Sequence, residues 1–334
     1  MKAIAYAQNG GPEVLTDLEL PTPAPGPRDL LVSVQAISVN PVDTKIRRGA
    51  AVTEPRVLGW DAVGVVQQVG SDVTLFKVGD PVFYAGAIDR PGSNSEWHLV
   101  DERIVGRKPK SLDNASAAAL PLTSITAWEL LFDRLGVAEG GGEGDSLLII
   151  GAAGGVGSIL TQLARKLTRL TVIGTASREE TREWVTDLGA HHVIDHSKPL
   201  VEQLEAIGVG QVSHVASLTH TDAHFEQLIE ALRPQGKLAL IDDPKSLDVV
   251  PMKRKALSLH WELMFTRSLY QTQDMIKQHE LLNRVADLID EGVLKTTLGE
   301  HYGSINAANL IRAHQLIESA KAKGKIVLEG FAAG

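Results

Sequence analysis

The chain has 334 residues, of which 43% are hydrophobic, and this length suggests about two domains with a substantial core. It contains no cysteine, which excludes disulfides and thiolate metal sites, and its net charge of −8 without a dense basic block argues against nucleic acid or an anionic membrane surface as a partner. The start lacks the apolar segment of a signal peptide and no apolar run approaches the roughly 18 residues of a membrane span, so we expect a soluble cytoplasmic protein.

Roughly the first 110 residues are expected to be rich in strands and turns. Segments 30–39 and 62–70 alternate or run apolar with valine and isoleucine, and stretches with glycine and proline such as "PTPAPGPRD" interrupt them. The segment 111–136 is rich in alanine and leucine, and it is expected to be helical on both sides of Pro121.

From Ser146 the sequence alternates between strand and helix patterns. Alternation of this kind predicts βαβ units and a parallel sheet with helices on both faces. Two helical stretches, 278–292 and 306–322, and a closing strand, 324–330, are expected to follow. The expected strands are 146–151, 170–175, 192–195, 212–216, 236–241 and a sixth within 256–263, and typical intervening helical patterns are 156–167 and 178–189.

The sequence "GAAGGVG" at 151–157 joins the first of these strands to a helix. It matches the dinucleotide fingerprint G-x-G-x-x-G with alanine at the first glycine position. A helix N-terminus at this point offers free N–H groups and a positive dipole end to a pyrophosphate. A bare glycine turn could be purely structural, but at least four more βα units follow, which favours a cofactor site. The expected cofactor contacts are Ala153, Gly154, Gly155, Val156 and Gly157.

The tip of the second strand, about 20 residues after the turn, distinguishes the two nicotinamide dinucleotides. NAD sites usually place a carboxylate there, but this chain has Ser177 and Arg178, a small hydroxyl followed by a cation that suits a 2′-phosphate. The sequence therefore favours NADPH over NADH. Ser177 could equally form a capping box with Glu180 at the start of the next helix, and both roles can hold together.

Five motifs, "GGPEVL", "VNPVDTKIRRG", "LGWDAVGVV", "PLTSITAWELL" and "GAAGGVGSI", occur in this order over nearly the whole chain. Together they resemble the medium-chain dehydrogenase/reductase superfamily, in its zinc-independent quinone oxidoreductase-like branch, whose members are often labelled zinc-type alcohol dehydrogenase-like. The resemblance implies an α/β protein in which a Rossmann doubly wound parallel sheet, the NADP-binding domain at 123–262, is inserted into a GroES-like β-rich catalytic domain formed by 1–122 and 263–334. It also implies a homodimer with edge pairing of the Rossmann sheets.

The label "zinc" can be tested against the residues. In zinc-dependent relatives three side chains hold the catalytic metal, and the corresponding positions here are Asn40, Trp60 and Leu122. Asp61 keeps an acid beside the second position, but one carboxylate does not make a tetrahedral site. No metal is therefore expected.

The histidines also form two groups that could suggest a metal. Both are expected to be accidental, because a metal needs a third convergent ligand. His196 instead matches the position where relatives place a tyrosine near the adenosine phosphate. The two groups are His220 with His224, and His191 and His192 with His196.

Without a Lewis acid, a nicotinamide reductase cannot polarise a simple ketone, but it can deliver hydride to a quinone or an α,β-unsaturated carbonyl. The protein then mainly positions the reactants and offers donors to the developing oxyanion. The resemblance also puts Lys325 where relatives complete the cofactor cleft. The candidates that it puts at the nicotinamide cleft are Asn40, Asp43, Trp60, Asp61, Tyr84 and Thr126.

These candidates have structural alternatives. Asn40 and Asp43 fit the N-cap and third position of a helix, with Pro41 at its first position. Trp60 could simply pack between strands. Tyr84 is the best proton donor on offer, with a proton from water as its rival. Thr126 could touch the nicotinamide or a phosphate, or cap a helix.

The sequence thus predicts an NADPH-dependent reductase of small-molecule quinones or activated alkenes that works without zinc. Two alternatives stay open: an alcohol or aldehyde dehydrogenase of the zinc-type family, and a non-catalytic NADPH-binding sensor.

Overall fold

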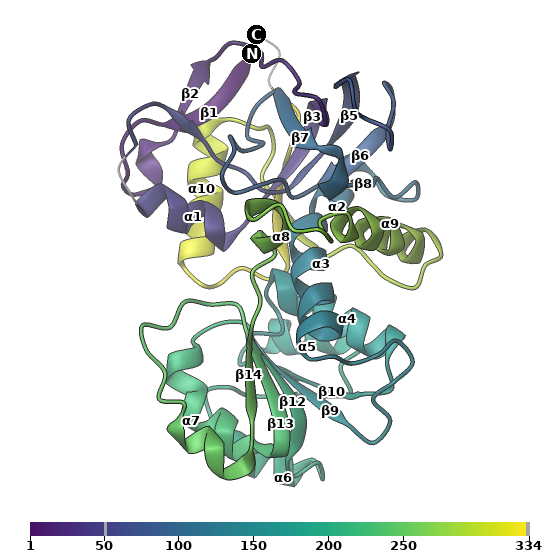
Figure 1. Cartoon of the computed structure of the whole chain (residues 1–334). Helices are drawn as coiled ribbons and strands as arrows, with labels where there is room; N and C mark the ends of the chain where they lie inside the picture. Colours follow the sequence, from purple (N-terminus) through teal and green to yellow (C-terminus); the bar gives the residue numbers. More distant parts are fainter. Residues whose placement is uncertain (50–51, 332–334) are drawn as a thin grey trace. The chain divides into compact units, whose positions relative to one another are not determined.

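The computed structural model describes residues 1–49 and 52–331, and the chain forms two compact units. The terminal unit is built from Met1–Ile125 together with the C-terminal part of the chain from Phe265, and the central unit is Thr126–Met264 (Figure 1). Two stretches that are far apart along the sequence therefore build one unit.

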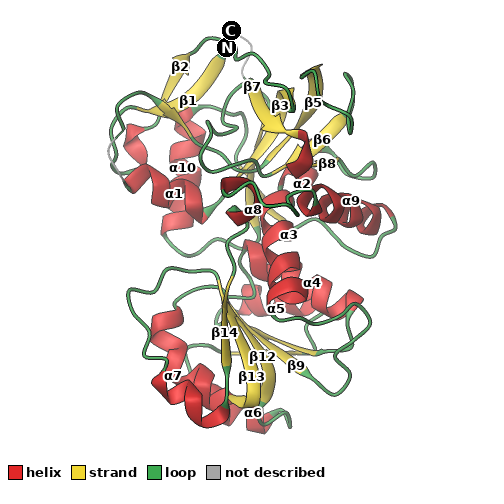
Figure 2. Ribbon diagram, in the orientation of Figure 1, coloured by secondary structure: helices red, strands yellow, loops and turns green. Residues whose placement is uncertain are grey.

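The terminal unit contains two sheets (Figure 2). The smaller sheet has the order β2-β1-β4, with β1 (Lys2–Tyr6), β2 (Thr16–Glu19) and β4 (Arg56–Val57). The larger sheet has the order β15-β16-β3-β5-β6-β8, and β7 pairs with β3. Its strands are β3 (Asp29–Val39), β5 (Ala62–Val69), β6 (Pro81–Tyr84), β7 (Trp97–Asp101), β8 (Val105–Arg107), β15 (Leu298–His301) and β16 (Lys325–Glu329).

Strand β3 is the centre of the larger sheet, and its residues are buried along most of their length. This explains the nearly continuous apolar run of the segment, since a strand covered on both faces needs no polar side. The late strand β16 runs antiparallel to β3, with Ile326 opposite Val39. This register brings Lys325 beside the end of β3 and the start of helix α1 (Pro41–Arg48).

The helices of the terminal unit follow the expected pattern. Helix α2 (Asn114–Ala118) ends before Pro121, which starts α3 (Pro121–Trp128), so the predicted break at this proline is confirmed. The segment Asn114–Arg134 is long and apolar enough to span a membrane, but 78% of its most apolar window is buried inside the protein, as in a core helix. The other helices are η1 (Pro12–Val14), η2 (Glu102–Ile104), α8 (Thr266–Leu269), α9 (Lys277–Asp290) and α10 (Ala307–Glu318).

The central unit contains one six-stranded sheet with the order β11-β10-β9-β12-β13-β14, and every pair in it is parallel. The chain moves outward from β9 to β11 and then returns to the other side of β9 with β12, so the sheet is doubly wound and its order reverses beside β9. Its elements are β9 (Ser146–Ile150), α4 (Gly155–Leu167), β10 (Thr171–Thr175), α5 (Glu179–Asp187), β11 (His192–Ile194), α6 (Leu200–Ala206), β12 (Val212–Ser217), α7 (Thr221–Ala231), β13 (Leu232–Leu240), η4 (Val250–Lys255) and β14 (Ser258–Trp261), preceded by the π-helical turn η3 (Glu129–Arg134).

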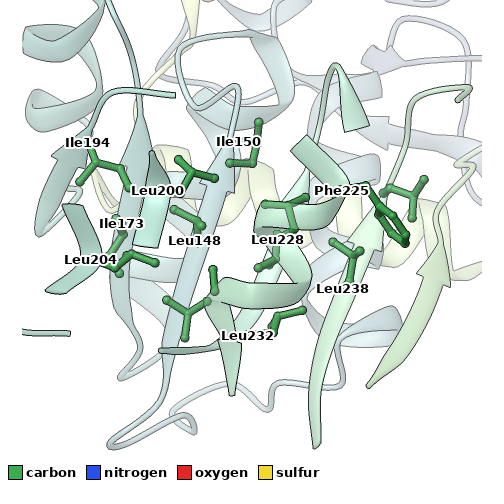
Figure 3. Packing of buried hydrophobic residues seen from close by; sticks show 14 of the residues in the cluster. Leu148, Ile150, Ile173, Ile194, Leu200, Leu204, Phe225, Leu228, Leu232 and Leu238 are labelled. Carbon is green, nitrogen blue, oxygen red and sulfur yellow. The ribbon is translucent and has the colours of Figure 1, made fainter. Parts of the chain in front are cut away.

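Leucine, isoleucine and phenylalanine side chains form the core on one face of this sheet (Figure 3). Leu148 and Ile150 from β9 meet Leu204 from α6 and Leu228 from α7. Burial of each such side chain stabilises the fold by about 1.5–3 kcal/mol, so this cluster is a main support of the sheet. On the sheet's other face α4 and α5 are joined by a hydrogen bond of 2.9 Å from Trp184 Nε1 to Ser158 Oγ.

The predicted α/β class and all six central strands are confirmed, with two local differences. Strand β13 begins at Leu232 rather than 236, because Leu232 already pairs with Val212 before the register shifts to His214 opposite Lys237. The proline and glycine between these pairs made that stretch look like a turn. The capping box of Ser177 is wrong: the N-cap of α5 is Arg178, and it makes no side-chain capping hydrogen bond.

Candidate active site

The glycine turn follows β9 at the point where the strand order reverses, the usual place for a ligand in an open parallel sheet. Gly151 has a φ of +82°, a conformation that favours glycine. A Cβ on Gly157 would lie 2.4 Å from Gly151 O, so only glycine permits this approach of helix and strand. At Gly154 the nearest atom to such a Cβ is 3.5 Å away, which leaves that side of the turn open.

The turn therefore fits a dinucleotide pyrophosphate. Gly154 is the N-cap of α4, a helix of 13 residues whose first N–H groups and positive dipole end point out of the turn. Thr175 Oγ1 accepts the Gly151 N–H at 3.1 Å and so fixes the turn against β10. A side chain at position 154 would fill the space that a phosphate needs.

The tip of β10 carries the two residues expected to bind a 2′-phosphate. Ser177 and Arg178 are both exposed, and Arg178 Nη1 lies 3.8 Å from Glu180 Oε1. The acid at the tip of the next strand, Asp195, accepts two hydrogen bonds from Ser197, which hold the pKa of Asp195 below its usual range. The carboxylate of Asp195 is thus occupied by hydrogen bonds within its own turn.

His196 lies beyond β11 and faces His224 of α7 edge to face, with ring centroids 6.2 Å apart. Burial lowers the pKa of His224, which keeps that ring neutral. His191, from the same group as His196, accepts the Val172 N–H at Nδ1 over 2.9 Å. Within residues 1–49 and 52–331 no group of three or more His, Asp or Glu side chains is arranged to hold a metal ion.

A buried polar network occupies the terminal unit where β3, β5, α3 and β16 meet. Asp61 is its centre: one carboxylate oxygen accepts from Ser38 Oγ at 2.7 Å and from Asn40 Nδ2 at 2.8 Å. Lys325 Nζ lies 3.1 Å from the same oxygen and also donates to Asn40 Oδ1. The other oxygen accepts the Leu122 N–H at 2.7 Å, at the N-terminus of α3. We call Ser38, Asn40, Asp61 and Lys325 the Lys325 network.

Asp43 lies one turn into α1 beside this network. Asn40 is the N-cap of α1, Pro41 is its first residue, and Asp43 Oδ2 accepts the Asn40 N–H at 2.7 Å, so the predicted helix start is confirmed. Asp43 is buried, and burial raises its pKa to about 7. Its second oxygen, Oδ1, has no hydrogen-bond partner among the described residues.

The donor set at the three zinc-ligand positions does not fit zinc. Asn40 Oδ1 already accepts a hydrogen bond from Lys325, and an asparagine amide is not among the usual zinc ligands. Trp60 turns its indole N–H to Ala87 O at 3.1 Å and packs edge to face on Phe265. The side chain of Leu122 has no atom that binds a metal, and its backbone N–H donates to Asp61.

Tyr84 lies on β6 next to Ala62 of β5, and its side chain is fully buried. The hydroxyl lies 3.0 Å from His98 Nδ1, and His98 Nε2 lies 2.9 Å from Pro91 O. Since the carbonyl of Pro91 can only accept, Nε2 carries the ring proton and Tyr84 donates to Nδ1. Burial lowers the pKa of His98 to about 4 and raises that of Tyr84, so this pair stays neutral.

The structure thus brings Asn40, Asp43 and Asp61 together with Lys325, with Trp60 adjoining them in sequence. Thr126 is buried within α3 and begins the central unit. Sequence reasoning missed three things: the role of Ser38, the partnership of Tyr84 with His98, and the link from Lys325 to Asp61. Of these, only the burial of His98 could have been suspected from the sequence, because His98 falls at a buried position of β7, whose residues alternate between buried and half-buried.

Known proteins resemble this chain over most of its length. Residues 26–110 match the family model of the alcohol dehydrogenase GroES-like domain, and residues 188–328 match that of the zinc-binding dehydrogenases. A zinc-type alcohol dehydrogenase-like protein of Staphylococcus aureus strain MSSA476 is 42% identical over 309 residues, 92% of each chain. A solved structure from Rhizobium etli CFN 42, provisionally named a zinc-dependent alcohol dehydrogenase, is 56% identical, with a TM-score of 0.95 over 100% of this chain and 99% of that one. The Escherichia coli quinone oxidoreductase, solved with NADPH, is 27% identical, with a TM-score of 0.85 over 98% of this chain and 100% of its own.

Proposed function

The chain belongs to the medium-chain dehydrogenase/reductase superfamily, and we propose that this oxidoreductase uses NADPH to reduce quinones or α,β-unsaturated carbonyls without zinc. The residues at the zinc-ligand positions carry the proposal, because an amide, an indole and an apolar side chain stand where a zinc-dependent enzyme needs metal ligands, and the amide is already bound to Lys325 and Asp61. An enzyme without a Lewis acid needs an acceptor that is already electrophilic.

The cofactor half of the proposal rests on the central unit. The open side of the turn at Gly154 and the N-terminus of α4 suit a pyrophosphate. Exposed Ser177 and Arg178 suit a 2′-phosphate, because a hydroxyl and a guanidinium both donate hydrogen bonds to its oxygens. We include His196 and Thr126 as further cofactor contacts, on the strength of the resemblance alone.

The acceptor half rests on the terminal unit. When bound, a reduced nicotinamide supplies a hydride from C4, which leaves negative charge on the acceptor oxygen. The Lys325 network gives this site a fixed arrangement of buried polar groups, and polar groups that are fixed in advance stabilise developing charge without reorganisation. The buried indole of Trp60 packs on Phe265 and makes the surroundings of this network apolar.

The proton that completes the reduction of an enone comes, in this proposal, from water. The Tyr84 hydroxyl already donates to His98 in a fully buried position, so using it as an acid would leave His98 Nδ1 without its donor. Asp43 has a pKa of about 7, and its Oδ1 has no hydrogen-bond partner among the described residues, so this carboxyl group can carry a proton near neutral pH.

A panel of substrates tests the function. We expect NADPH oxidation with 9,10-phenanthrenequinone, 1,2-naphthoquinone and simple enones, and a much weaker reaction with NADH. NADPH binding without turnover on the whole panel would indicate a sensor. Turnover of simple alcohols that depends on added zinc would indicate an alcohol dehydrogenase.

A homodimer is also proposed. Strand β14 is an edge strand of the central sheet, and Trp261 and Leu263 at its end are 53% and 52% exposed. Exposed apolar side chains on an unpaired edge favour association through strand pairing. Light scattering on the wild type and on Trp261→Glu tests this: a monomeric wild type contradicts it.

A further inference from the structure

Lys325 is a buried cation whose hydrogen bonds all stay within the protein. Its ammonium donates to Val39 O at 3.0 Å, to Asn40 Oδ1, and to Asp61 at 3.1 Å. An ammonium has three N–H groups, so these three acceptors use all of them. The side chain is only 3% exposed. Lys325 therefore has no donor left for a phosphate or a substrate, and it can act on either only through the groups that it holds and through its charge.

The ammonium determines how the Asn40 amide is oriented. Asn40 Oδ1 faces Lys325, and Nδ2 faces the carboxylate of Asp61. The reverse orientation would point the NH₂ group at the ammonium and the carbonyl oxygen at the carboxylate, which is unfavourable at both ends. Lys325 and Asp61 together thus allow one orientation of Asn40.

We propose that Lys325 is a positioning residue, which fixes the amide of Asn40 and the carboxylate of Asp61 beside the positions at which zinc-dependent relatives hold a metal. The inference rests on the proposed function and names the residue behind its metal-free chemistry. Without the ammonium, the Asn40 amide would lose the partner that orients its oxygen, and Asp61 would be left buried without a counter-charge. The ammonium would also disfavour a zinc ion at this place, since it already neutralises the carboxylate.

Asp43 provides a readout of the charge on Lys325 that does not require turnover. Burial raises the pKa of Asp43 to about 7, Lys325 opposes this rise, and Asp61 adds to it. The N–H groups of Asn40 and Gly59 also face Asp43 and favour its ionised form. Removal of the ammonium should therefore move the pKa of Asp43 further upward.

The central test is Lys325→Met, which keeps the length of the side chain and removes its charge. Because this variant leaves Asp61 buried without a cation, the double variant Asp61→Asn/Lys325→Met serves as the folded reference. Lys321→Met, at an exposed lysine of the same segment, is the matched control. The measurements are thermal unfolding, the Kd of NADPH by titration, kcat with a quinone that the wild type reduces, and the titration of Asp43 followed by NMR of its labelled carboxyl carbon.

We expect Lys325→Met to leave the Kd of NADPH within about twofold of the wild type, to lower kcat about 100-fold, and to raise the pKa of Asp43. The double variant should regain thermal stability but not kcat. Two results would overturn the proposal: full kcat in the double variant, which makes the pair purely structural, or weaker NADPH binding with normal kcat, which makes Lys325 a cofactor contact. A wild type that turns over nothing refutes the proposed function, and an unchanged Asp43 titration in Lys325→Met then refutes this inference separately.

Discussion

The guanidinium of Arg47 and the imidazole of His314 are hydrogen-bonded in the core of the terminal unit, with 2.6 Å between Nη1 and Nδ1. Arg47 also donates to Gly10 O at 3.0 Å and pairs with Glu318, so it joins α1 to α10. Burial and the adjacent charge lower the pKa of His314 to about 3, and the ring is a neutral acceptor. The packing of α1, whose N-cap is Asn40, thus depends on an uncharged histidine.

The stability of the protein should therefore fall in mild acid. The unfolded chain protonates His314 near pH 6.5, whereas the folded chain does so only near pH 3. The free energy of unfolding should decrease as the pH falls below 6.5, by up to about 1.4 kcal/mol per pH unit for this residue. Urea unfolding between pH 7 and pH 5 measures this slope. His314→Gln keeps an acceptor for Arg47 and should show a slope smaller by that amount; equal slopes in the two proteins would contradict the assignment.

Two glycines of the turn should respond differently to alanine. Gly157→Ala puts a Cβ 2.4 Å from Gly151 O and should lower the free energy of unfolding by about 1–3 kcal/mol. Gly154→Ala meets nothing closer than 3.5 Å and should fold normally, yet it should weaken NADPH binding at least about tenfold, because it fills the space for the pyrophosphate. Denaturation and NADPH titration separate the two effects. Normal NADPH affinity in Gly154→Ala would show that no phosphate approaches there.

Arg178 should determine the preference for NADPH. A charge-assisted hydrogen bond contributes about 1.5–3 kcal/mol, so Arg178→Ala should raise the Kd of NADPH about 10- to 100-fold and leave that of NADH unchanged. Arg169→Ala, at another exposed arginine of the central unit, is the control. If both cofactors lose affinity equally, Arg178 recognises something other than the 2′-phosphate.

Tyr84→Phe tests the source of the proton. The variant loses the hydrogen bond to His98 and leaves a buried acceptor unsatisfied, which should cost about 1–3 kcal/mol of stability. If water supplies the proton, kcat should change equally, and little, for enones and for quinones. A selective loss of enone reduction would instead assign the proton to Tyr84.

The sequence allowed a correct prediction of the central sheet because each strand ends in a recognisable turn and each helix shows an apolar period. The glycine turn and the start of α1 at Asn40 were equally predictable, since their geometry follows from neighbouring residues. The start of β13 was not, because a register shift in the pairing overrode the local turn signal.

The polar contacts of the site could not be predicted. Asp61 and Lys325 are 264 residues apart, and nothing near either one indicates the other. The pair exists because β16 lies against β3 in a particular register, which is a property of the folded sheet. For the same reason the contact between the Tyr84 hydroxyl and His98 on β7 could not be predicted.

The distance along the chain between Asp61 and Lys325 also sets an order of events during synthesis. A ribosome working at 5–20 residues per second needs roughly 13–50 s to add the residues between them. During that interval the central unit can complete its own sheet, while Asp61 in the unfinished terminal unit lacks the ammonium of Lys325. A chaperone that recognises unfinished proteins would therefore meet the N-terminal strands first, and the pairing of β16 with β3 would end their exposure.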